Sequence, residues 1–143
     1  MIDWYKKVVF ENYANFSGRA RRSEYWYFTL CNFLIIMVLL SPMIFSLIIT
    51  QDNSEPPFLF YVSLVLIIIY QLAILIPTLA VSVRRLHDSG KSGWYYLVNF
   101  IPYVGGIIFL VLACIDSEDY ANKWGENPKA TPDEINQIGG AQF

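Results

Sequence analysis

The side chains most able to do chemistry lie in one short polar segment, RRLHDSGKSGW, residues 84–94. It contains the only histidine of the chain, His87, directly followed by Asp88. Because histidine titrates near neutral pH, such a pair can relay protons or orient a substrate. The pair more often braces a turn, and no serine or cysteine nucleophile stands at a matching spacing. We therefore assign no catalytic residue and expect a protein that is not an enzyme.

The sequence offers two possible cofactor sites, and neither fits a known motif. The run SGKSG (residues 89–93) ends like a phosphate-binding loop, but that motif needs glycine at position 85, where the chain has Arg85. The preceding stretch also reads as a membrane helix rather than a strand. Cys31 and Cys114 lie inside apolar segments, without the spacing of metal ligands. We expect no cofactor and no metal.

A second polar motif, NFSGRARRSEYWYF (residues 15–28), combines clustered bases with aromatic residues. A base near an anionic leaflet gains about 1 kcal/mol, and tyrosine and tryptophan favour the headgroup level. The motif therefore indicates either a simple membrane anchor or a specific headgroup site. Together the two motifs supply six candidates for binding a lipid or a protein partner: Arg19, Arg21, Arg22, Arg84, Arg85 and Lys91.

Acidic and polar residues are interleaved with these bases. Glu24 and Asp88 stand among the arginines, and a third motif, YANKWGENP (residues 120–128), contributes Asn122. We hypothesise that Glu24 and Asp88 pair with arginines and fix the two basic segments against each other. The predicted structural polar cluster is Glu24, His87, Asp88 and Asn122.

The composition indicates which elements must position these residues. The 143 residues are 55% hydrophobic and only 15% charged, whereas a soluble domain averages about 25% charged residues. These values exclude a soluble enzyme, a disordered chain and a disulfide scaffold, and the net charge of −2 argues against nucleic-acid binding. We expect one membrane domain, residues 1–128, followed by a loose polar tail, residues 129–143.

The fold class predicted is an all-α integral membrane protein. Two uncharged stretches, residues 25–49 and 58–83, exceed the roughly 20 residues that a helix needs to cross a bilayer. A third, residues 94–115, is interrupted by Pro102, Gly105 and Gly106, which predicts either a kinked span or a re-entrant helical hairpin. We prefer the kinked span.

The N-terminal residues 1–13 project onto a helix with one apolar and one charged side. Trp4, Tyr5, Val8 and Val9 share the apolar side, as expected of a helix that lies in the membrane interface. The alternative is a helix docked on the bundle.

Orientation follows from the basic residues. Eight of the ten lysines and arginines fall before residue 25 or in residues 84–93, whereas residues 50–57 carry only the acids Asp52 and Glu55. Because bases favour the cytoplasmic side, we expect the N-terminus in the cytoplasm. The side of the C-terminus depends on whether residues 94–115 span or re-enter.

Three sequence stretches carry a family resemblance: GRARRSEYWYF, RRLHDSGKSGW and NKWGENP, in this order around apolar segments. The chain thereby resembles the YhaH/YhaI-like bacterial inner-membrane proteins, domain-of-unknown-function family 805, over residues 4–128. The resemblance implies a small multi-pass protein of the inner (cytoplasmic) membrane without an established activity, so no catalytic residue is carried over. Two features depart from the pattern, Trp124 and the extension after Pro128.

We therefore expect a non-enzymatic module whose basic cytoplasmic face binds anionic lipid headgroups or a protein partner. A subunit of an oligomeric channel or transporter is the alternative, with Asn32, Gln71 or Asn99 lining the path. A membrane-embedded enzyme that uses His87 and Asp88 is a third hypothesis. A homo-oligomer or a membrane-protein partner is compatible with all three.

Overall fold

The computed structural model describes residues 1–50 and 55–129, and within these ranges the regular elements are all helical. The prediction of an all-α protein is confirmed. The acidic residue Asp52 and the predicted tail beyond residue 129 lie outside the described residues. The elements are α1 (Ile2–Lys6), the π-helix η1 (Lys7–Glu11), α2 (Arg22–Ile49), α3 (Phe58–Asp88), the 3₁₀-helix η2 (Gly93–Phe100) and α4 (Gly105–Cys114).

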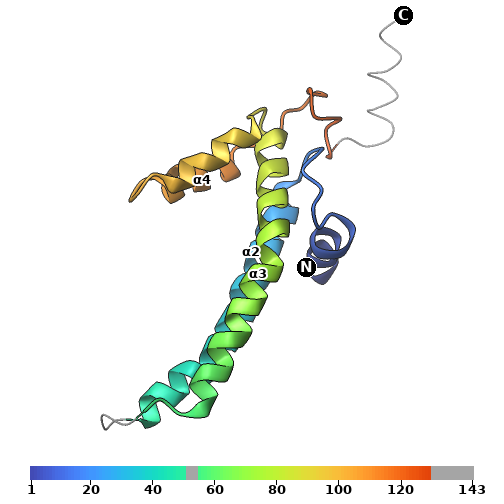
Figure 1. The fold of residues 1–143 in the computed structure, drawn as a ribbon. Coiled ribbons are helices and arrows are strands. Elements are labelled where there is room, and N and C mark those ends of the chain that lie inside the picture. Colours follow the sequence, from blue (N-terminus) through green and yellow to red (C-terminus); the bar gives the residue numbers. More distant parts are fainter. Residues whose placement is uncertain (51–54, 130–143) are drawn as a thin grey trace, which may run out of the picture. The chain divides into compact units, whose positions relative to one another are not determined.

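The chain divides into two compact units. The first consists of residues 1–14 and 26–78, and the second of residues 15–25 and those from Leu79 onward. The long helices α2 and α3, labelled in Figure 1, contribute residues to both units. Each unit has its own packing and is described separately below.

Helices α2 and α3 are the two described helices that are long and apolar enough to cross a membrane. Only 6% and 11% of the residues in their most apolar windows are buried inside the protein. A core helix of a soluble protein would be mostly buried, whereas these helices expose leucine, isoleucine and phenylalanine along their length. Their outer faces therefore suit hydrocarbon.

Each long helix of the first unit contains a proline whose structural cost is offset locally. Proline lacks an N–H, so Pro42 and Pro77 each deprive the carbonyl four residues earlier of its helical donor. The Ser41 hydroxyl donates to the carbonyl of Val38 at 2.8 Å. The Tyr13 hydroxyl donates to the carbonyl of Ala73 at 2.7 Å. Such replacement donors allow proline within a membrane helix.

The N-terminal helix docks on the long helices of the first unit through aromatic contacts. The Tyr5 ring stacks on Phe28 of α2, and its hydroxyl lies 3.3 Å from that of Tyr70 on α3. Tyr70 in turn donates to the amide oxygen of Asn32, and Val8 is fully buried. The predicted helix is confirmed, and its contacts are those of the docked alternative. Its place in the membrane interface stays a prediction.

Helix α3 continues further than the sequence predicted. Residues 84–88 were expected in a loop but form its last helical turn. Gly90, with φ of +72°, then ends the helix, and the N–H groups of Gly90 and Lys91 bond the carbonyls of His87 and Leu86. These two bonds define a Schellman cap. Charged residues remain helical here because their side chains find buried partners in the second unit.

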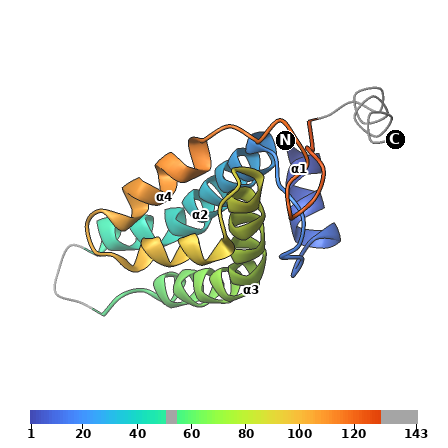
Figure 2. The ribbon, with the colours of Figure 1, turned by 90° about the horizontal axis from the view of Figure 1, so that it is seen from above.

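Residues 93–114 form a hairpin rather than the kinked span that we preferred. Helices η2 and α4 are its two arms, drawn in yellow and orange in Figure 2. They meet through the rings of Tyr96 and Phe109, whose centroids are 5.4 Å apart. Gly105 lies so close to η2 that a Cβ there would approach the carbonyl oxygen of Val98 to 2.2 Å. The kinked-span prediction is therefore wrong, and the alternative hairpin describes the geometry.

The two adjacent glycines of α4 offer a matched test of the hairpin. We expect Gly105→Ala to lower the free energy of unfolding by about 1–3 kcal/mol, because its methyl group meets backbone that cannot rotate away. Gly106 has open space around its missing Cβ, so Gly106→Ala should be neutral or stabilise by up to about 1 kcal/mol through helix propensity. Thermal unfolding of both variants in detergent measures the difference; equal effects would contradict the close approach.

Candidate functional site

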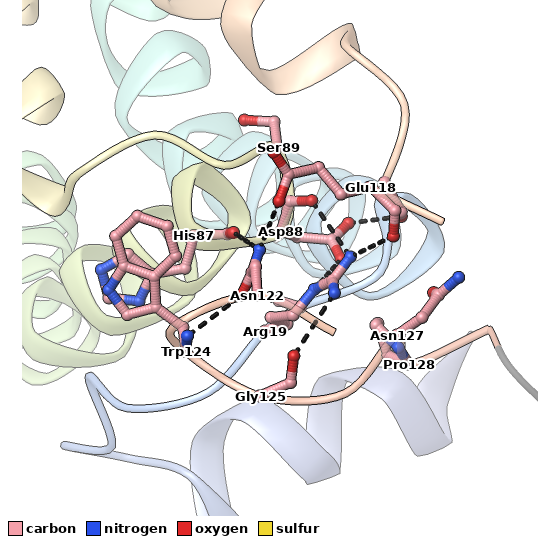
Figure 3. A network of polar contacts seen from close by, with 12 residues as sticks. Arg19, His87, Asp88, Ser89, Glu118, Asn122, Trp124, Gly125, Asn127 and Pro128 are labelled. Carbon is pink, nitrogen blue, oxygen red and sulfur yellow. Dashed lines mark hydrogen bonds and ion pairs between the residues drawn. The ribbon is translucent and has the colours of Figure 1, made fainter. Parts of the chain in front are cut away.

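The carboxylate of Asp88, at the end of α3, is the centre of a buried polar network in the second unit (Figure 3). Its Oδ1 accepts from Nε of Arg19 at 3.0 Å, and its Oδ2 accepts from Nη1 of Arg85 and from the Ser117 hydroxyl. The side chains of Arg19 and Asp88 are 1% and 0% exposed. Two guanidinium groups thus share one carboxylate away from water.

Arg19 links the second polar motif, residues 15–28, to the third, residues 120–128. Its Nη1 donates to the carbonyl of Tyr120 at 2.8 Å, and its Nη2 donates to the carbonyl of Glu118 at 2.6 Å. Figure 3 shows the guanidinium among Asp88, Glu118 and Gly125. The backbone N–H of Glu118 donates to the carbonyl of Asp88 at 3.0 Å. Residues far apart in the sequence are therefore joined by one side chain.

Arg85 closes the hairpin. Its Nε donates to the carbonyl of Ala113 at 2.9 Å, and its Nη2 donates to that of Ile115. Helix C-termini leave carbonyls without intrahelical donors and favour a cation, so Arg85 caps α4. A third bond, 3.3 Å long, runs from Nη1 to the carbonyl of Ala20. Arg85 is fully buried, and its bonds hold the C-terminal end of α4 next to the last turn of α3.

A second buried ion pair joins α2 to α3. Nη1 of Arg84 lies 2.7 Å from Oε1 of Glu24, and both side chains are at most 4% exposed. The Nε and Nη2 atoms of Arg84 have no hydrogen-bond partner in the described part of the chain. Buried donors without a partner cost free energy. The Glu24–Arg84 pair therefore contributes less to stability than the Asp88 network.

His87 packs on the third motif instead of pairing with Asp88. Its Nδ1 lies 3.3 Å from the carbonyl oxygen of Gly18, and its ring stacks on Trp124 with centroids 4.5 Å apart. Asn122 donates to the backbone carbonyl of His87 at 2.9 Å and accepts from the N–H of Trp124. The ring of His87 and the carboxylate of Asp88 thus have different partners, and the arrangement is that of a braced turn.

Three of the six predicted binding bases, Arg19, Arg84 and Arg85, are buried in these contacts. Of the other three, Arg21 donates from Nε to the carbonyl of Pro128, and Nε of Arg22 lies 3.5 Å from Oδ1 of Asp116. Lys129 also donates to Asp116 and holds the pKa of that exposed carboxyl below its usual value. Lys91 is partly exposed, and its ammonium has no polar partner among the described residues.

The structure brings the predicted cluster together and adds members that the sequence did not indicate. Glu24, His87, Asp88 and Asn122 all lie in the second unit, where Glu24 forms an ion pair with Arg84. The missed contributors are mainly backbone carbonyls, which carry no residue-type signal. The Ser117 hydroxyl was missed because a lone serine after an apolar run has no distinctive pattern.

Two apolar helices, an apolar hairpin and a buried arginine–carboxylate network define a small helical integral membrane protein. Residues 13–126 match the family model described as Protein of unknown function (DUF805). The chain is 38% identical to inner membrane protein YhaI of Escherichia coli K12 over 128 residues, 90% of this chain and 97% of that protein. It is 37% identical to YhaH of the same strain over 133 residues, 92% of this chain and 100% of that protein.

The chain therefore belongs to the DUF805 family. The predicted resemblance is confirmed, as is the class of bacterial inner membrane protein that it implied. No solved structure matches the chain.

Removing the central carboxylate tests the network. We expect Asp88→Asn to lower the free energy of unfolding by about 3–5 kcal/mol, because two buried guanidinium groups lose their counter-charge. Asp119→Asn is the control: this aspartate is exposed, and exposed substitutions change stability by about 0.5 kcal/mol or less. Thermal unfolding in detergent measures both, and equal stabilities would contradict the network.

Proposed function

We propose that the protein is a non-enzymatic module of the inner membrane, whose cytoplasmic face binds anionic lipid headgroups. The observation that carries the proposal is the exposed apolar surface of the hairpin η2–α4. Phe100, Tyr103 and Ile107 are 76%, 99% and 66% exposed, and Trp94 is 78% exposed. An exposed apolar surface of this extent is typical of a membrane or partner contact.

The lengths of the two arms support insertion into one leaflet. Helix η2 has eight residues and α4 ten, which correspond to about 16 Å and 15 Å. Each is roughly half of a hydrocarbon core about 30 Å thick. The turn also suits lipid, because the N–H groups of Ile101 and Gly105 bond the carbonyls of Val98 and Ile101, and Pro102 has no N–H.

The contacts of Arg85 support a common side for the two ends of the hairpin. Gly93 contacts the last turns of α3, where a Cβ would lie 2.8 Å from Cγ1 of Val83. At the other end, the carbonyls of Ala113 and Ile115 bond Arg85. Because the basic residues predict a cytoplasmic N-terminus, we propose that the chain after α4 also returns to the cytoplasmic side.

A tail fusion tests this topology. We expect a fluorescent protein fused after Phe143 to be fluorescent and alkaline phosphatase at the same place to be inactive, because fluorescence requires the cytoplasm and phosphatase activity the periplasm. Fusions after Pro57, between the two spans, should give the opposite pair of results. Phosphatase activity after Phe143 would contradict insertion of the hairpin into the cytoplasmic leaflet.

A second function, a subunit of an oligomer that forms a path through the membrane, is favoured by Gln71. This amide is exposed near the middle of α3, between the exposed residues Ile69 and Leu72. An amide facing hydrocarbon loses its hydrogen bonds, and one from a second copy would restore them. Asn32, by contrast, is already bonded to Tyr70.

Replacing this amide tests the oligomer. We expect Gln71→Leu to shift the protein in lipid nanodiscs from dimers or larger assemblies to monomers, measured by stepwise photobleaching of a single dye. Leu72→Ala, which changes an equally lipid-facing position, should leave the assembly intact. A wild-type protein that is already monomeric would contradict this second function.

A further inference from the structure

A groove with a volume of about 400 Å³ lies beside the last turns of α3, within the second unit. Ligand pockets commonly have about 300–1,000 Å³, so the groove is large enough for part of a small amphipathic molecule. Its walls are largely apolar, and its polar side-chain groups are those of His87 and Ser92 together with the ring N–H of Trp94 and the hydroxyl of Tyr96. The apolar walls come from Phe16, Leu79, Val83, Trp94, Tyr96 and Leu97.

One nitrogen of His87 is available to a ligand in this groove. Nδ1 lies against the carbonyl oxygen of Gly18, which can only accept, so Nδ1 carries the hydrogen. In the neutral ring Nε2 is then an acceptor. It has no hydrogen bond in the described part of the chain, although His87 is only 8% exposed. Gly93 leaves this atom uncovered, since a Cβ there would lie 3.5 Å from Nε2.

A lysine lies next to two of the groove's lining residues in the sequence. Lys91 precedes the lining residues Ser92 and Gly93, and it is the one base of the six candidates whose side chain has no polar partner among the described residues. An ammonium group binds phosphate as a point charge and gains most where water is partly excluded. The neighbourhood therefore combines an apolar wall, a free cation and a free hydrogen-bond acceptor.

We propose that this groove binds one anionic glycerophospholipid whose headgroup carries a hydroxyl. The acyl chain lies along Leu79, Val83 and Leu97, the phosphate pairs with Lys91, and the headgroup hydroxyl donates to Nε2 of His87. This site rests on the proposed function, because the groove must open to the leaflet that the hairpin η2–α4 enters. It assigns the lipid binding of the cytoplasmic face to one place.

In this proposal Lys91 and His87 distinguish lipids by their headgroups. Phosphatidylglycerol offers both the negative charge and the hydroxyl. Phosphatidylethanol is a phosphodiester with the same single negative charge but no hydroxyl, and phosphatidylcholine offers neither a net negative charge nor a donor. The expected order of retention is therefore phosphatidylglycerol, phosphatidylethanol, phosphatidylcholine.

The test uses the full-length protein in nanodiscs of phosphatidylcholine with a minor fraction of either phosphatidylglycerol or phosphatidylethanol. Native mass spectrometry then counts the lipids that each protein retains. We expect Lys91→Gln to lower retention of phosphatidylglycerol about fivefold, the effect of one base near a membrane surface. Lys6→Gln, which removes an exposed lysine of α1 outside the groove, is the matched control and should leave retention unchanged.

A second pair of variants tests the apolar wall. Leu97→Trp fills the groove and should reduce retention of every lipid at this site. Leu110→Trp makes the same change on α4, outside the groove, at a side chain with the same 52% exposure. Because both leucines are at the surface, neither variant should prevent folding, and circular dichroism checks this.

The outcomes separate the site from the proposed function. A wild-type protein without preference for phosphatidylglycerol would contradict lipid binding altogether. A preference that survives both Lys91→Gln and Leu97→Trp but is lost in Arg21→Gln or Arg22→Gln would keep the proposed function and overturn the groove. Equal retention of phosphatidylethanol and phosphatidylglycerol would overturn the role of the Nε2 atom of His87.

Discussion

The structure of the second unit depends on the burial of one carboxylate, Asp88, with two arginines. Removing a charge from water costs several kcal/mol, and the attraction between partners offsets this only when the remaining donors are also bonded. Here those donors go to backbone carbonyls of residues 113–125, so the charges are satisfied only when the hairpin and the third motif are in place. Burial of the charges and the fold of residues 113–125 therefore depend on each other.

The two units meet the same constraint, carbonyls without helical donors, by different chemical means. In the first unit the hydroxyls of Tyr13 and Ser41 bond the carbonyls that Pro77 and Pro42 leave free. In the second, guanidinium groups bond the carbonyls at the end of α4. A hydroxyl suits the middle of a bilayer because it brings no charge, whereas arginine suits the end of a span, where water and carboxylates are near.

The sequence was sufficient to predict the two long apolar helices, because uninterrupted apolar length is a local property. It also indicated that Glu24 and Asp88 would meet arginines, since acids and bases alternate in both motifs. It did not decide between a kink and a hairpin, because Pro102 and Gly105 interrupt a helix equally well in both. That choice depends on Arg85, whose partners are 28 and 30 residues away in the sequence and belong to the backbone.

Counting bases along the chain also overstated the basic surface, because buried backbone carbonyls bind several of the arginines. A guanidinium group has five donors in a planar fork and can satisfy several carbonyls at once, so arginines are the bases that this fold buries. Lysine is a strongly hydrated point charge and stays outside. Of the six bases that the sequence placed on one face, the three that this fold buries are all arginines, whereas Lys91 is partly exposed and directly precedes residues that line an apolar groove. The anion site that we propose therefore rests on that single lysine more than on the arginine clusters that dominate the sequence.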